Sequence, residues 1–175
     1  MSLSLEDYRS DVGVAKWIAE VGVTDAPVPR RNLRTALAFF RQAMPMLPVA
    51  MAANFLRAMD LSRPVVDIML TPSDRVIAYR VGNESPFKLF YTRAGASPHA
   101  SGINPHARSI VRFQVRGTAR ALESYTSGTL DVWTVPSEDQ PLTFAPRANK
   151  SGVMVAGGGT QLIIPRAFAL LQPVG

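Results

Sequence analysis

Hydrophobic positions recur with a helical period through the first third of the chain. An apolar stripe predicts a helix from Leu5 to Val21, and its members are Tyr8, Val12, Ala15, Ile18 and Ala19. A second helix is predicted from Asn32 to Met44, with its arginines outward and with three inward residues, Leu33, Leu37 and Phe40. A short third helix is predicted from Val49 to Met59, and helical patterning extends to about Pro72.

Near Asp60 the pattern begins to favour β-branched and aromatic residues, which are typical of strands. Arg75 to Val81 and Phe87 to Thr92 are predicted as two strands joined by a polar turn. Ser109 to Val115 alternates Ile110, Arg112 and Gln114 with Val111, Phe113 and Val115. This alternation predicts a strand with one wet face.

The remainder of the chain predicts further strands separated by polar loops. Thr118 to Tyr125 fits either a short helix or a strand, and DVWTV, which starts at Asp131, predicts a strand. The last one or two strands are expected within Gly152 to Ile164 and Phe168 to Leu171. The whole pattern predicts an α+β fold, with an N-terminal helical segment (1–59) and a compact, mostly antiparallel sheet (60–175) that together form one compact unit.

Composition narrows the class of protein. The 175 residues are 47% hydrophobic and 18% charged, which predicts a globular chain able to bury a core. The start lacks the layout of a signal peptide, and no apolar run is long enough to span a membrane, so the chain is expected to be soluble. The absence of cysteine excludes disulfides, thiol nucleophiles and cysteine metal sites.

The charge is strongly basic and is carried mostly by arginine. The net charge is +6, and lysine occurs only at Lys16, Lys88 and Lys150. An arginine surplus favours polyanionic partners, because the planar guanidinium binds phosphate and carboxylate in a forked geometry. The alternative is a codon habit of a GC-rich genome.

The run AGGGTQLIIP, from Ala156 to Pro165, is the leading candidate for one wall of an active site. Its three glycines allow positive φ angles or a close backbone approach, and Gln161 begins the strand that follows. The amide of Gln161 can donate to and accept from a ribose hydroxyl or a water. The alternative is a glycine-bulged edge strand with a solvent-facing glutamine. Neither a Rossmann nor a P-loop fingerprint is present.

Other candidate side chains lie in the strands before this run. Arg80 and Arg93 suit a diphosphate clamp, although each also fits an exposed position on an amphipathic strand. Asp131 and Trp133 share one face of their predicted strand, where a carboxylate and a flat ring can border one cleft or simply form part of a core. The two histidines, His99 and His106, match no zinc spacing and no hydrolytic triad, so no metal is expected.

Several motifs resemble the catalytic domains of bacterial polymorphic toxins, specifically the family catalogued as toxin type 46. The resemblance covers Asp60 to Ile164, and its most specific parts are FYTRAGASPHASGIN, which starts at Phe90, and GGGTQ, which ends at Gln161. The order of arginine, glycines and glutamine is also similar to NAD-glycohydrolase toxins with an ADP-ribosyltransferase-like sheet. In that comparison Gln161 stands where transferases carry a glutamate, and Arg80 resembles their first-strand arginine, with Arg93 as its rival.

The resemblance implies roles for the candidate residues. Gln161 would position the ribose hydroxyls, Asp131 would steady the developing positive charge, and Arg80 or Arg93 would bind the diphosphate together with Arg108. Tyr91 or Trp133 would stack on nicotinamide. Further residues of the same motifs would line the binding site: Thr92, Ser97 and Gly158.

The function expected from this resemblance is hydrolysis of NAD, or of NADP, as a substrate rather than a bound cofactor. The first alternative is transfer of ADP-ribose to a protein or RNA, which the lack of an acidic residue at Gln161 or Gly159 disfavours. An RNA-binding or RNA-cleaving toxin and a non-catalytic interaction module are the others. The resemblance also implies a cognate immunity protein and a secreted or injected effector that acts in the target-cell cytoplasm. The N-terminal helices belong either to the catalytic domain or to a larger delivery protein.

Overall fold

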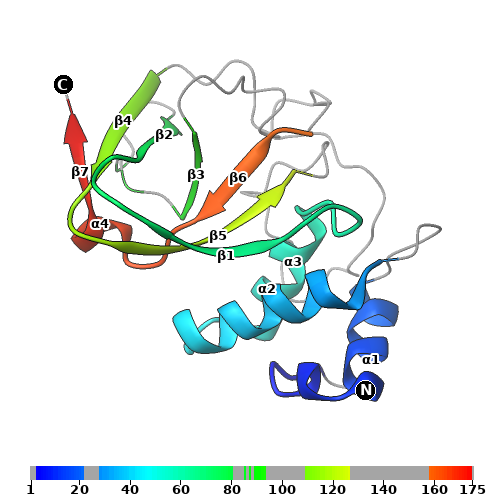
Figure 1. Cartoon of the computed structure of the whole chain (residues 1–175). Coiled ribbons are helices and arrows are strands. Elements are labelled where there is room, and N and C mark those ends of the chain that lie inside the picture. Colours follow the sequence, from blue (N-terminus) through cyan, green and yellow to red (C-terminus); the bar gives the residue numbers. More distant parts are fainter. Residues whose placement is uncertain are drawn as a thin grey trace.

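The computed structural model describes residues 3–21, 28–80, 85, 87, 89–93, 109–126 and 158–174. A layer of helices packs against one side of a curved sheet (Figure 1). The predicted strand that starts at Asp131 lies outside the described residues. No helix in the described part of the chain is long and apolar enough to cross a membrane.

The helical layer contains η1 (Asp7–Arg9), α1 (Asp11–Val21), α2 (Arg30–Ala43) and α3 (Val49–Arg57). The second and third predicted helices are confirmed, with ends shifted by one or two residues. The first is confirmed only from Asp11, because Leu5 to Ser10 forms a turn and η1 instead of an α-helix. In α2 the inward positions Leu33, Leu37 and Phe40 are buried, as their spacing predicts.

The buried face of α1 is different from the predicted stripe. Val12 is 80% exposed, whereas Val14, Trp17 and Val21 are fully buried. These three residues are themselves spaced at i, i+3 and i+7, so a second apolar stripe of the same helix is the buried one. Gly13 lies on this side, where η1 packs so closely that a Cβ would collide with the carbonyl of Asp7.

The sheet has seven strands, and every neighbouring pair is antiparallel. Its spatial order is β1-β5-β6-β3-β2-β4-β7, which places β3 at the centre, β6 beside it in the interior, and β1 and β7 at the edges. The bounds of the strands are β1 (Val66–Leu70), β2 (Arg75–Arg80), β3 (Phe90–Arg93), β4 (Ser109–Val115), β5 (Ala119–Tyr125), β6 (Thr160–Ile163) and β7 (Leu171–Val174). The α+β prediction is confirmed.

Two local predictions for the sheet region were wrong. The helical pattern extended to Pro72 crosses β1, where pairing with β5 fixes an extended backbone. The predicted strand from Phe168 to Leu171 is instead α4 (Ala167–Leu170) followed by β7. Thr118 to Tyr125, which fitted two structures, contains β5 and no helix.

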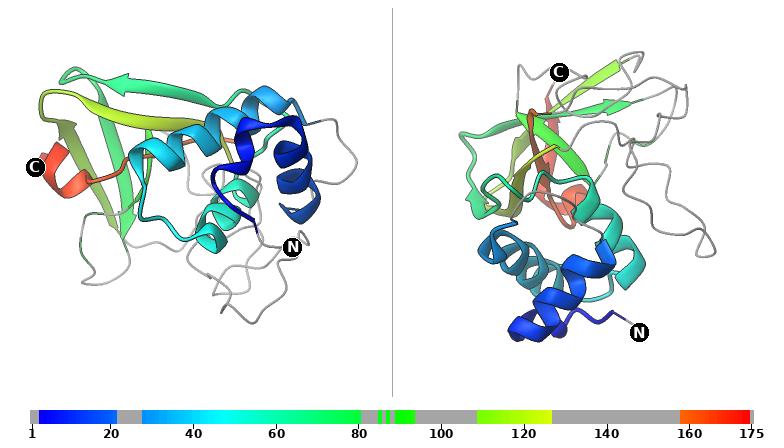
Figure 2. Two further views of the ribbon diagram at one scale, coloured as in Figure 1. Left: turned by 90° about the horizontal axis from the view of Figure 1, so that it is seen from below. Right: turned by 90° about the vertical axis from the view of Figure 1, so that its right-hand side faces the viewer.

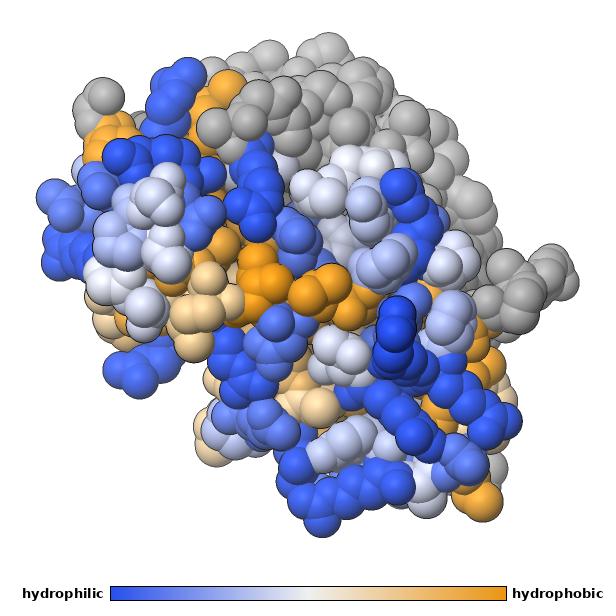
Figure 3. Space-filling model, viewed as in Figure 1, coloured by the Kyte–Doolittle hydropathy of each residue, from blue (hydrophilic) through white to orange (hydrophobic). Residues whose placement is uncertain are grey.

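Two hydrophobic cores lie on opposite faces of the sheet. One joins the helices to the sheet through Leu122 and Ile163. The other, which includes Tyr91, Phe113 and Leu162, fills the space around which the sheet curls (Figure 2). The space-filling view shows hydrophilic residues over much of the helical layer and hydrophobic residues gathered between helices and strands (Figure 3). The strand β6 contributes to both cores, through Ile163 on the helical side and Leu162 on the other.

Candidate active site

Gln161 lies in an interior strand of the sheet. Its strand, β6, is paired on one side with β5 and on the other with β3, and its side chain is only 4% exposed. The alternative of an edge strand with a solvent-facing glutamine is therefore wrong. Gly158, three residues earlier, has a φ of +83°, a conformation that favours glycine and that the glycine run predicted.

The amide of Gln161 is fixed by two hydrogen bonds. Its nitrogen Nε2 donates to the carbonyl oxygen of Ala58 at 3.3 Å and to Oγ of Ser124 at 3.2 Å. A backbone carbonyl can only accept, so the nitrogen must point toward Ala58 and both of its hydrogens are used. The hydrogen-bonding capacity that is left belongs to the carbonyl oxygen Oε1, which is an acceptor. The sequence allowed both donation and acceptance, and the geometry narrows this to acceptance.

Buried polar residues lie close in sequence to the two partners of this amide, at the end of α3 and at the end of β5. Arg57, which precedes Ala58, is 2% exposed and donates from Nη1 to Oδ1 of Asn54 at 3.1 Å. Ser124 and Thr126 are also buried. A cation in such surroundings is costly unless it is paired or hydrogen-bonded, so its presence marks a place where the interior is polar by construction. The sequence carried one signal for it, an asparagine and an arginine three residues apart at the end of a mainly apolar helix.

The backbone at the start of β6 is tied to both neighbouring strands. Oγ1 of Thr92 donates to the carbonyl of Thr160 at 3.1 Å. The backbone nitrogen of Thr126 donates to the carbonyl of Gly159 at 2.8 Å, and that of Gly158 donates to the carbonyl of Thr126 at 3.0 Å. Thr92 and Gly158, two predicted binding residues, therefore border the same end of the sheet as Gln161.

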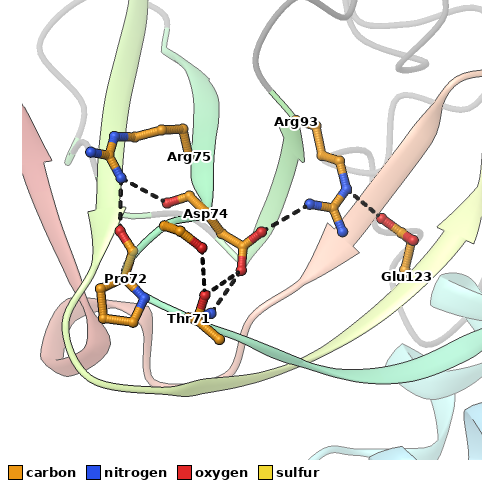
Figure 4. A network of polar contacts seen from close by, with 7 residues as sticks. Thr71, Pro72, Asp74, Arg75, Arg93 and Glu123 are labelled. Carbon is orange, nitrogen blue, oxygen red and sulfur yellow. Dashed lines mark hydrogen bonds and ion pairs between the residues drawn. The ribbon is translucent and has the colours of Figure 1, made fainter.

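Arg93 is held between two carboxylates, as Figure 4 shows. Its Nε lies 2.8 Å from Oε2 of Glu123, and its Nη1 lies 3.4 Å from Oδ1 of Asp74. The backbone hydrogen bond from Thr71, followed by the charge of Arg93, holds the pKa of Asp74 below its usual value. Two carboxylates around one guanidinium leave little positive potential for a phosphate, which weakens the case for Arg93 as a diphosphate clamp.

A second arginine at this end of the sheet was missed by sequence reasoning. The guanidinium carbon of Arg63 lies 3.5 Å from the ring centroid of Tyr125, and its Nη1 lies 3.5 Å from the carbonyl oxygen of Gly158. Both contacts lie beside the start of β6, because Tyr125 pairs with Thr160. Arg63 lies within the stretch from Asp60 to Ile164 that carries the family resemblance, but nothing in the local spacing indicates which surface it covers.

The other predicted site residues are distributed unevenly. Tyr91 is buried, with its ring centroid 5.6 Å from that of Phe113, so in this conformation it packs in the core instead of presenting a face to a ligand. The backbone of Arg80 pairs with Ser109 near the end of β2 that lies away from Arg93. The remaining candidates lie outside the described residues: Ser97, Arg108, Asp131 and Trp133.

The part of the chain that the structure describes contains no group of three or more histidine, cysteine or acidic residues that could hold an ion. What the described site offers is an acceptor oxygen, threonine hydroxyls, a positive-φ glycine and arginines. These groups suit binding and orientation of a polyanionic ligand with hydroxyl groups.

Comparison with solved structures shows a shared fold. The structure of Tse6 in complex with Tsi6 matches with a TM-score of 0.60 at 20% identity, over 86% of this chain and 99% of that chain. Rhs1-CT in complex with its cognate immunity protein RhsI1 aligns over 66% of this chain and 83% of that chain at 20% identity, with a TM-score of 0.37 that supports no conclusion about fold. No family model and no curated protein matches the sequence. The likeness to Tse6 concerns the fold alone.

Proposed function

We propose that this chain is a toxin domain that hydrolyses NAD, or NADP, between nicotinamide and ribose. The observation that carries the proposal is the Gln161 amide, buried in an interior strand of the sheet beside a positive-φ glycine, with its nitrogen already engaged and an acceptor oxygen left. Two further supports are the motifs that resemble NAD-glycohydrolase toxins and the fold shared with Tse6.

The reaction needs little acid or base catalysis from the protein. A water oxygen forms a bond to C1′ of the ribose, the bond from C1′ to the nicotinamide nitrogen breaks, and its electron pair neutralises the cationic ring. Nicotinamide, ADP-ribose and one proton are released. The enzyme must mainly orient the ribose, stabilise an oxocarbenium-like transition state and admit one water.

In this proposal Gln161 accepts a hydrogen bond through Oε1 from a ribose hydroxyl or from the attacking water. A neutral acceptor steadies the ribose without a full charge beside it. Arg80 and Arg108 remain proposed phosphate contacts, Asp131 remains the proposed stabiliser of positive charge, and Trp133 the proposed stacking partner of nicotinamide. Position 161 is a glutamine and not the glutamate expected of a transferase. We therefore propose hydrolysis in preference to transfer of ADP-ribose to a macromolecule.

A partner and a place of action follow from the same proposal. A domain that consumes NAD would harm the cell that makes it, so we include a cognate immunity protein. Tse6 was solved in complex with Tsi6, a binding partner for this fold. With a net charge of +6, an acidic inhibitor is the best electrostatic match. The domain would act after secretion or injection, in the cytoplasm of the target cell.

The test is release of nicotinamide from NAD by the purified chain. Gln161→Ala is expected to lower turnover at least about a hundredfold, by analogy with the loss of one preorganised hydrogen bond in other active sites. Gln161→Met keeps the volume, and thermal unfolding shows whether each variant is folded. The matched control is Gln172→Ala, an exposed glutamine on β7, which should leave turnover unchanged.

Three results would overturn the proposal. The first is no nicotinamide release by the wild-type chain, and the second is equal release by a folded Gln161→Met variant. The third is radioactive label from NAD accumulating in a protein or RNA, which would identify a transferase instead.

A further inference from the structure

Arg63 is an exposed arginine held in one orientation. Its guanidinium carbon lies 3.5 Å from the centroid of the Tyr125 ring, and its Nη1 donates to the carbonyl oxygen of Gly158. Stacking on a ring restrains a guanidinium while leaving its edge, with most of its N–H groups, available to a ligand. Within the described part of the chain, no carboxylate lies within salt-bridge distance of Arg63.

The backbone that carries Arg63 is pinned by the helical layer. Buried Asn32, on α2, donates from Nδ2 to the carbonyls of Leu61 at 3.0 Å and Arg63 at 2.9 Å, while its Oδ1 accepts from the backbone nitrogen of Val65 at 3.4 Å. Asp60 closes the same turn, since its backbone nitrogen donates to the carbonyl of Tyr125 at 2.8 Å. The turn that presents Arg63 is therefore fixed to both α2 and β5.

We propose that Arg63, with Tyr125 and the turn at Gly158, forms a phosphate-binding corner for the diphosphate of the dinucleotide. The inference deepens the proposed function and rests on it for the identity of the ligand. Forked recognition of a phosphate needs a pre-oriented guanidinium that is not already paired, and no carboxylate among the described residues pairs with Arg63, whose Nη1 is oriented by the carbonyl of Gly158. Arg93, by contrast, already binds two carboxylates. Arg63 is thus the described arginine at this end of the sheet that is open to an anion.

The experiment is isothermal titration of the full chain with ADP and, separately, with adenosine. ADP carries the diphosphate without the nicotinamide bond, so the measurement does not depend on turnover. Arg63→Gln is expected to weaken ADP binding by about tenfold or more and to leave adenosine binding unchanged. Arg63→Lys keeps the charge but loses the flat stack, so an intermediate loss is expected.

The control is Arg112→Gln, which removes the same charge from an exposed position on β4 and should not change ADP binding. Thermal unfolding of every variant excludes loss of fold. The inference is overturned if wild type does not bind ADP, if folded Arg63→Gln binds ADP as wild type does, or if adenosine binding falls equally. Nicotinamide release by wild type is scored separately, so failure of the proposed hydrolysis and failure of the phosphate corner give different results.

Discussion

Arg63 and Arg93 lie at the same end of the sheet, where β6 begins, but their surroundings differ. Arg93 is bound by Glu123 and Asp74, whereas Arg63 rests on Tyr125 with no carboxylate near it among the described residues. In the first arrangement the guanidinium is neutralised by the two carboxylates. In the second the guanidinium is held in place while its charge is still available to an anionic ligand. Two arginines of equal formal charge therefore have different capacities to bind an anion.

Among the variants that test this difference, Asn32→Ala is expected to change stability the most. The change removes three hydrogen bonds to the turn of Arg63 and leaves buried backbone groups without partners. We expect the free energy of unfolding to fall by about 3 kcal/mol, since each unsatisfied buried group costs about 1 to 3 kcal/mol. Urea unfolding measures this, and ADP titration should show weaker binding because the turn is no longer fixed.

The control for Asn32→Ala is Thr35→Ala on the same helix, where the hydroxyl donates only to the carbonyl of Arg31. This change should alter stability by no more than about 0.5 kcal/mol. A loss below about 1 kcal/mol for Asn32→Ala would mean that the turn is held by other contacts, and pre-orientation of Arg63 by the helical layer would be wrong.

A smaller effect is expected from Arg93→Gln. Glu123 and Asp74 then face each other without a cation between them, and we expect a loss of about 1 kcal/mol in the free energy of unfolding. ADP binding should not change. Arg63→Gln is the matched variant, and the opposite pattern is expected for it. The free energy of unfolding should fall by only about 0.5 to 1 kcal/mol, the contribution of an exposed cation–π pair, whereas ADP binding should weaken. Equal losses of ADP affinity in both variants would remove the distinction between the two arginines.

Much of the fold could be predicted because periodicity reflects burial directly. Ser109 to Val115 alternates as an antiparallel strand with one wet face must, and the inward positions of α2 follow its 3.6-residue period. Errors arose where a distant contact decides the outcome. In α1 two apolar stripes overlap, and only the packed structure shows that Val14, Trp17 and Val21 form the buried one. The strand β1 is a strand because β5 pairs with it.

The candidate site could be predicted only in part, for a similar reason. A glutamine after glycines was visible in the sequence, but its burial and its bonds to Ala58 and Ser124 depend on β6 being an interior strand of the sheet. Arg63 could not be told from Arg93, because neither residue's spacing reveals the carboxylates or rings that the fold brings to it. Local patterns predict elements, whereas the electrostatics of a site depends on tertiary neighbours.

The smallest effect is expected from Asp74→Asn, and it depends on pH. The pKa of Asp74 is lowered, chiefly by the backbone hydrogen bond from Thr71 and then by Arg93. A lowered pKa means that the native state favours the charged form, so this stabilisation is complete above the ordinary pKa of about 3.9 and is lost as pH falls through the native value. The free energy of unfolding of wild type should exceed that of Asp74→Asn by less than about 1 kcal/mol at pH 7, and this difference should shrink below about pH 4.

The same measurement in an Arg93→Gln background separates the two causes. Oδ2 of Asp74 accepts from the backbone nitrogen of Thr71 at 2.7 Å, while Arg93 lies farther away at 3.4 Å from Oδ1. Most of the pH-dependent gap should therefore survive without Arg93, as midpoints of thermal unfolding between pH 3 and pH 7 would show. If the pH-dependent stability difference disappears instead, the charge of Arg93 is the main cause of the lowered pKa of Asp74. The ion pair would then be stronger than its distance of 3.4 Å suggests.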